Sequence, residues 1–263
     1  MVKMGTVWDR TAEFLTDNLT AILPIALLAY FVPFSIMRSL APILYETPGA
    51  IMVLWGIVFA LVVLVNWGGL ALTAMALEQE GEPGAVAVRR LAPSLLVSIL
   101  LFCGAILLAL PAILTLDIGN GIEGLTLSFP VSVQIALPLY CVLAIGLAVW
   151  LAARLMLVNP LIVAERRWLS AILRSWSLTR GTALSIVGVT VLYTVVAIVG
   201  MLATQLVFGS IFRLVAGPAE GLSLSNILTS VMIAAVQAGF TLVVPVFTAK
   251  LYQALLAARA ERA

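Results

Sequence analysis

Long uncharged stretches alternate with short polar segments along the whole chain. Six runs contain no Asp, Glu, Lys or Arg, and they cover residues 18–37, 47–77, 91–116, 124–153, 181–212 and 221–249. A helix needs about 20 residues to cross the ~30 Å hydrocarbon core of a bilayer, so each run is long enough for one crossing. The pattern predicts six transmembrane helices, which we place at about 19–37, 51–77, 93–116, 131–153, 183–208 and 226–249.

Short amphipathic segments precede the first, third and fifth of these spans. They lie at about 6–17, 84–91 and 168–180, and each combines basic with apolar residues before a chain-breaking residue. This composition is typical of helices that lie in the membrane interface. The alternative is that any span following a cytoplasmic loop carries basic residues and a stop signal. We predict an all-α membrane protein, a single transmembrane domain over residues 1–263 made of three hairpins, each preceded by a cytoplasmic interfacial amphipathic helix.

Two local features sharpen this prediction. Asn18 is expected to adopt a left-handed conformation that ends the first amphipathic helix. Proline lacks a backbone donor and restricts the residue before it, so we expect Asn159 and Pro160 to bend or end the fourth span.

The composition also predicts that this chain is embedded in a lipid bilayer. Hydrophobic residues make up 63% of it and charged residues only 10%, with a mean hydropathy of +1.19, which leaves too little polar surface for a water-soluble protein. The net charge of +2 gives no indication of a nucleic-acid partner. Cys103 and Cys141 lie inside apolar runs and suggest neither a disulfide nor a metal site.

The positions of the basic residues predict the orientation. Twelve of the fourteen Lys and Arg residues lie in the segments on one side of the predicted spans, and only Arg38 and Arg213 lie on the other. Basic residues favour the cytoplasmic side of bacterial membrane proteins. We therefore expect a multi-pass protein of the bacterial inner membrane with both termini in the cytoplasm.

Residues 154–181, which we call the hinge segment, are the richest in candidate functional residues. Arginines and two tryptophans suit contact with lipid phosphates and headgroups. The candidates for lipid or partner binding are Arg154, Asn159, Pro160, Glu165, Arg166, Arg167, Trp168, Arg174, Trp176 and Arg180. A purely structural belt beneath the helix bundle is the competing interpretation.

Glu165 is the unusual acidic residue of the hinge segment. A carboxylate close to lipid requires a cation, and we expect Arg154, Arg174 or Arg10 to pair with it. A structural ion pair is favoured over a catalytic or proton-coupled role.

Uncharged polar residues also occur at membrane depth. The candidates are Asn66, Gln134, Gln205 and Gln237, and none is ionisable. Asn66 precedes Trp67 and two glycines that allow another backbone to approach closely, so hydrogen bonding between helices competes with substrate contact.

The sequence motifs of the hinge and the N-terminus resemble a known family. The motifs are R-x4-NP-L-IV-x-E and A-x2-RSW-x-LTRG within 154–181, and V-x-DR-x3-F-x3-N within 7–18. They resemble the bacterial six-span proteins called the glycerophosphoryl diester phosphodiesterase membrane domain. The resemblance implies an inner-membrane protein that is sometimes fused to a soluble phosphodiesterase. That soluble enzyme resembles a TIM barrel with catalytic histidines, and the present sequence contains no histidine.

These observations favour a protein without catalytic machinery. No histidine and no nucleotide-binding motif is present, so we expect no catalytic residues, no metal and no cofactor. The expected role is a lipid-interacting scaffold or accessory component of the cell envelope, with membrane lipids and a cytoplasmic or membrane protein as partners and the oligomeric state left open. The alternative is a passive carrier or exporter of a lipid-like or apolar solute, which a central cavity lined by Asn66 and the glutamines would favour. An intramembrane enzyme is the third and weakest hypothesis.

Overall fold

The computed structural model describes residues 3–46, 51–120, 131–217 and 223–261. Within these ranges the regular secondary structure is helical, and no strand occurs. The elements are α1 (Met4–Asp17), α2 (Leu19–Ala26), the π-helical turn η1 (Leu27–Phe31), α3 (Val32–Glu46), α4 (Ile51–Ala76), α5 (Pro83–Asn120), α6 (Val131–Leu155), α7 (Val158–Ala164), α8 (Ser170–Leu178), α9 (Ala183–Ala216) and α10 (Leu224–Ala260).

Six helical stretches within the described residues are long and apolar enough to cross a membrane. They are Leu19–Leu40, Met52–Ala76, Pro83–Ile113, Ala136–Ala164, Ala183–Ala216 and Leu224–Ala260. The prediction of a six-span helical membrane protein is therefore confirmed at this level. Several of the helices extend past the predicted limits, because a helix continues through its flanking charges into the interface.

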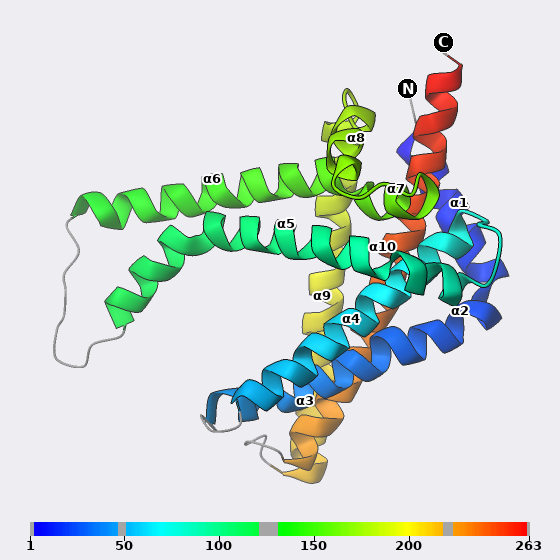
Figure 1. Cartoon of the computed structure of the whole chain (residues 1–263). Helices are drawn as coiled ribbons and strands as arrows, with labels where there is room; N and C mark the ends of the chain where they lie inside the picture. The colour runs from blue at the N-terminus through cyan, green and yellow to red at the C-terminus, as the bar shows by residue number, and fades with distance from the viewer. Residues whose placement is uncertain (1–2, 47–50, 121–130, 218–222, 262–263) are drawn as a thin grey trace.

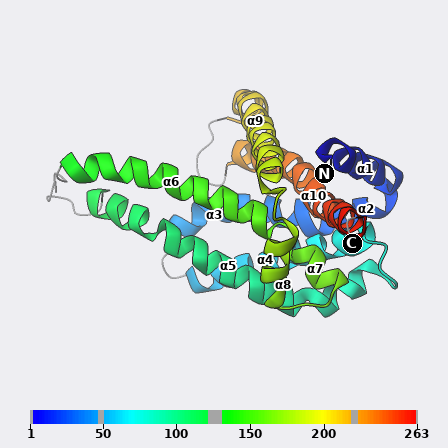
Figure 2. The same cartoon turned by 90° about the horizontal axis from the view of Figure 1, so that it is seen from above.

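The helices diverge from one end of the molecule (Figure 1). At that end, which we call the hinge end, α1, α7 and α8 gather near the C-terminal part of α10, and α1 packs directly against α10. Helices α5 and α6 project together away from α9 and α10, and Figure 2 shows the same divergence from above. Helix α4 packs closely on α5, and α9 packs closely on α10.

The best-packed core lies at the hinge end. Leu157, Leu161 and Ile162 are completely buried there, together with Leu70 of α4 and Leu251 of α10. Most of the remaining helix surface is apolar and exposed, as expected for helices that face lipid. The hinge end is therefore the part of the molecule in which side chains are held most firmly.

Glycine lets α4 approach the first span closely. An added Cβ at Gly68 would collide with the Cβ of Ala29, and Ala29 is completely buried. The expected role of the glycine pair in close backbone approach is thus seen at Gly68.

Two local predictions differ from the structure. Residues 84–91 do not form a separate helix, because α5 runs without interruption from Pro83 through Pro93 to Asn120. Trp67 anchors the first turn of α5, since its Nε1 donates to the carbonyl oxygen of Gly84 at 3.2 Å. A proline inside a membrane helix interrupts its own hydrogen bond but need not end the helix when neighbouring helices support it.

Asn18 also acts differently from the prediction, whereas the fourth span is interrupted just past Arg154, as predicted from Asn159 and Pro160. Asn18 ends α1 with φ −108°, outside the left-handed region, and its Nδ2 donates to the carbonyl oxygen of Phe14 at 3.0 Å. Helix α6 already ends at Leu155, and Pro160 lies in the first turn of α7. Proline is well tolerated in a first turn because the N–H it lacks would have no partner there.

Candidate functional site

A cavity of about 710 Å³ lies among the spans, and it is open rather than sealed. This volume falls within the range of ~300–1,000 Å³ that is usual for small-molecule sites. Each of the six spans contributes to its wall, for example Tyr30, Asn66, Ser98, Asn159, Tyr193 and Gln237. Most of the remaining lining is aliphatic, so the cavity combines an apolar wall with a few separate polar groups.

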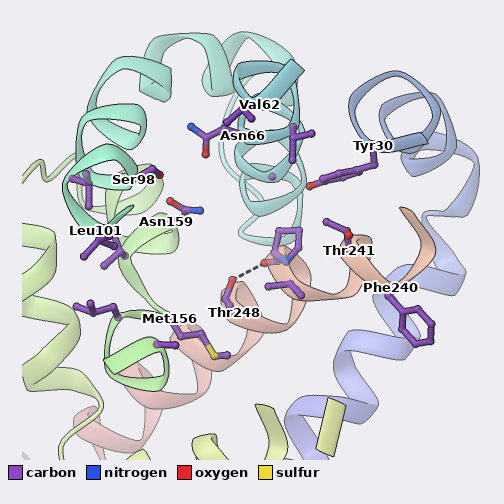
Figure 3. Close-up of a pocket in the computed structure, with 18 of the residues that line it drawn as sticks. Tyr30, Val62, Asn66, Ser98, Leu101, Met156, Asn159, Phe240, Thr241 and Thr248 are labelled. Atoms are coloured by element: carbon purple, nitrogen blue, oxygen red, sulfur yellow. Dashed lines mark hydrogen bonds between the residues drawn. The ribbon is translucent and has the colours of Figure 1, made fainter. Parts of the chain in front are cut away.

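The π-helical turn η1 places Tyr30 at this cavity. Tyr30 is only 2% exposed, and its ring lies next to Gly68 and Gly69 of α4. Figure 3 shows its hydroxyl pointing into the cavity from the side opposite Asn66 and Asn159. Single π-helical turns inside longer helices occur frequently at functional sites.

Asn66, Ser94 and Asn159 bring three segments of the chain together beside the cavity. Ser94 Oγ lies 3.1 Å from Asn66 Oδ1 and 3.3 Å from Asn159 Oδ1. One hydroxyl has one hydrogen and can donate to only one of these oxygens at a time. The buried Nδ2 of Asn66 has no hydrogen-bond partner among the described residues. The cluster therefore joins helices, as the glue interpretation predicts, and the Nδ2 of Asn66 is enclosed within it.

The three glutamines predicted at membrane depth have different surroundings. Gln237 lines the cavity, and its Oε1 accepts hydrogen bonds from Arg38 Nε at 3.1 Å and Nη2 at 3.0 Å. Gln205 is exposed on α9 and does not line the cavity. The side chain of Gln134 lies outside the described residues. Arg38 itself lies inside the first span, where the sequence analysis placed it in a loop.

A smaller cavity of about 170 Å³ adjoins the first. Both are lined by Met156, Tyr193 and Val244, and the smaller one continues to Trp8 of α1. Trp8 lies 6.3 Å from Tyr193 between ring centroids and is 43% exposed. The shared side chains therefore separate the central cavity from the smaller cavity, which lies next to Trp8 of α1.

Glu165 is the centre of the polar contacts in the hinge segment. Its Oε2 pairs with Arg167 Nε at 2.6 Å, and its Oε1 lies 3.5 Å from Arg174 Nε. Tyr252 of α10 donates its hydroxyl to the same Oε1 at 3.1 Å. The expected pairing with Arg174 is present. The pairing with Arg154 is wrong, and among the described residues no ion pair joins Arg10 to Glu165.

Arg154 lies against two tryptophans that also contact each other. Its guanidinium carbon lies 5.2 Å from the ring centroids of both Trp150 and Trp176, and the two rings meet edge to face at 5.0 Å. Its Nη1 also donates to the carbonyl oxygen of Trp176 at 3.4 Å. Attraction between a cation and the aromatic faces explains why this arginine does not turn to Glu165.

The remaining hinge candidates divide by exposure. Arg166, Arg167, Trp168 and Arg180 are exposed, whereas Pro160 is buried. On α8, Ala171 and Ser175 are buried, while Leu169 and Leu173 are exposed, the latter by 76%. Leu169 and Leu173 therefore point away from the protein, while Ile172 packs against the core.

Two further hydrogen bonds fix α8 to its neighbours. Ser175 Oγ donates to the carbonyl oxygen of Arg154 at 2.6 Å, which occupies an acceptor in the last turn of α6. Arg259 Nη2 of α10 donates to the carbonyl oxygen of Ser177. Helix α8 is thus attached to both the fourth and the sixth span.

Sequence reasoning missed several residues of these sites, among them Tyr30, Arg38, Ser94, Trp150, Tyr193 and Tyr252. Serine and threonine hydroxyls in helices commonly bond to their own backbone, as Thr73 does with the carbonyl of Gly69, so a hydroxyl in an apolar run does not by itself indicate a site. The polarity of Ser94 within an apolar run was the one available signal.

The fold and the cavity define a multi-pass helical membrane protein with a ligand-sized space among its spans. Comparison with family models, curated proteins and solved structures gave no match. The resemblance to the phosphodiesterase membrane domain family therefore stays a prediction.

Proposed function

We propose that this chain is a non-enzymatic membrane carrier that binds a lipid-like amphiphile in its central cavity. The supporting observation is a cavity of about 710 Å³ to which all six spans contribute. A tightly packed bundle would have favoured the scaffold hypothesis, whereas a cavity lined by Asn66 and Gln237 favours the carrier.

The lining supports a ligand with both apolar and polar parts. Lipid tails are as apolar as leucine, so moving an acyl chain from the bilayer into the cavity changes its free energy little. Preference for a ligand must then come from the polar groups. Tyr30, Ser98 and Gln237 line the cavity and can form hydrogen bonds to the polar part of such a ligand.

The smaller cavity suggests the way in. It continues from Tyr193 to Trp8, and tryptophan prefers the level of the lipid headgroups. With the orientation that the basic residues predict, this path leads to the cytoplasmic leaflet of a bacterial inner membrane. We propose that α1 and α8 lie in that interface, and that the six spans form three hairpins with both termini in the cytoplasm.

A second candidate function is a lipid-interacting scaffold. Its support is the exposed apolar surface formed by Trp168 and Leu169, which precede α8, and by Leu173 of α8, close in sequence to the exposed arginines Arg166 and Arg180. Such a surface suits anionic lipid or a membrane protein partner. A scaffold of this kind does not require the cavity.

Transport by purified protein in liposomes distinguishes the two functions. The probe is a monoacyl phospholipid with an NBD label on its chain, and dithionite reports how fast it leaves the inner leaflet. We expect transfer faster than in protein-free liposomes, and a return to that background in Ala197→Trp, which fills the cavity wall. Ala203→Trp, on the exposed side of the same helix, is the control and should transfer normally.

Two results would contradict the carrier. A wild-type rate equal to that of empty liposomes would leave the scaffold as the better proposal. Equal rates in Ala197→Trp and the wild type would separate transport from the cavity.

A further inference from the structure

Arg38 is a charged residue inside the first span, close to the central cavity. Its Nε and Nη2 both donate to Oε1 of Gln237, and Gln237 lines the cavity. An arginine near the end of a span usually extends its side chain to the headgroups. Here the side chain instead contacts Gln237 of α10. At ~1.5 Å per residue, Gln237 lies about 20 Å from the start of α10 at Leu224.

The charge of Arg38 has no counter-charge in the part of the chain that the structure describes. Both ion pairs found there belong to Glu165. A glutamine oxygen satisfies hydrogen bonds but carries no net charge. Removing a guanidinium partly from water is costly unless an anion pairs with it. The site at Arg38 therefore lacks an anionic partner within the described residues.

Donors for an anion are also available at this position. A guanidinium has five N–H groups, and the bonds of Arg38 to Gln237 use only two of its nitrogens. Within the described residues, neither Nη1 of Arg38 nor Nε2 of Gln237 donates to an acceptor. The planar arrangement of guanidinium donors matches the paired oxygens of a carboxylate or a phosphate.

We propose that Arg38 and Gln237 bind the oxyanion of an anionic amphiphile whose apolar chain occupies the central cavity. The inference rests on the proposed function and specifies its ligand, a lipid with a carboxylate or phosphate group. Arg38 supplies the charge and Gln237 holds the guanidinium at the cavity wall.

Binding of three radiolabelled probes to the purified full chain tests this inference. The probes are oleate, oleoyl lysophosphatidate and the uncharged monoolein, which share one acyl chain and differ in the head. We expect Arg38→Gln to raise the dissociation constants of oleate and lysophosphatidate on the order of tenfold, because a hydrogen bond to a charged group is lost. The dissociation constant of monoolein should change less than twofold. Arg213→Gln, an exposed arginine of α9, is the matched control and should leave all three unchanged.

A second variant protects the test against misfolding. Gln237→Glu places a carboxylate beside Arg38 and neutralises it without removing either side chain, so it should weaken the two anionic probes as Arg38→Gln does. Acetate has the charge but no chain and should not displace oleate at equal concentration. Displacement of oleate by acetate would indicate a site for free anions and would contradict the proposal that the ligand is an amphiphile.

The remaining outcomes separate this inference from the proposed function. Suppose that monoolein binds to the wild type, but Arg38→Gln weakens the binding of all three probes equally or of none. The proposed oxyanion site is then wrong, while the carrier proposal stands. If no probe binds to the wild type, the cavity is not a lipid site and both proposals fail.

Discussion

The hydroxyl of Tyr252 donates a hydrogen bond of 3.1 Å to Oε1 of Glu165, although 87 residues separate them in the chain. Tyr252 belongs to the last span and Glu165 to the hinge segment. Arg167 and Arg174 approach the same carboxylate from the hinge side. The carboxylate is therefore one of the points at which α10 is joined to the segment between the fourth and fifth spans, besides the bond from Arg259 to Ser177.

Tyr252→Phe should lower the free energy of unfolding by about 1–2 kcal/mol, because it removes a hydrogen bond to a charged acceptor and keeps the buried ring. The measurement is the melting temperature in detergent. In a Glu165→Ala background the same change should cost less, since the acceptor is already gone. Additive losses in the double variant would show that the two side chains are not coupled.

Gly68→Ala should destabilise the protein by about 1–3 kcal/mol, as overpacking of a filled core does. The new methyl group would meet the Cβ of Ala29, which is buried and cannot move aside. Gly104→Ala is the control, because its Cβ would enter open space on α5 and alanine favours a helix. Thermal unfolding monitored by size-exclusion chromatography compares the two, and equal losses would exclude close packing at Gly68 as the cause.

Arg154→Lys should not be a conservative change. Lysine keeps the charge but loses the flat guanidinium that lies 5.2 Å from both Trp150 and Trp176. We expect a loss of stability on the order of 1 kcal/mol, measured as a lower melting temperature. Arg180→Lys, at an exposed position, should have no effect. A similar loss in both variants would indicate that the stacking contributes nothing.

Cysteine labelling tests the predicted orientation. In a variant without Cys103 and Cys141, Ser170→Cys reports on α8 and Leu214→Cys on the opposite end of α9, and both positions are exposed. An impermeant maleimide added to intact spheroplasts should label the Leu214→Cys variant alone. Labelling of the Ser170→Cys variant from outside would reverse the orientation and place the hinge segment away from the cytoplasmic leaflet.

The number of spans could be predicted because the thickness of the bilayer imposes a minimum length on each uncharged run. The cavity could not be, because it depends on which faces of separate helices meet. Gln237 and Gln205 look alike in the sequence, yet one lines the cavity and the other faces outward. Single-sequence patterns do not carry that tertiary information.

Arg38 illustrates a more specific reason. A charge ends an uncharged run by definition, so the first span was predicted to end at residue 37, whereas the helix continues through Arg38 to Glu46. A buried or paired arginine and a loop arginine give the same signal in sequence. Only the contact with Gln237 distinguishes them.

The π-helical turn at Leu27–Phe31 has a consequence for the length of the first span. Such a turn corresponds to one residue added to an ordinary helix, and one residue corresponds to about 100° of rotation. Deleting a single residue there would let the helix become regular. Arg38 would then be rotated relative to the residues before the turn and would point away from α10. Variants that alter the spacing between Asn18 and Arg38 should therefore be tolerated less well than many changes of side chain.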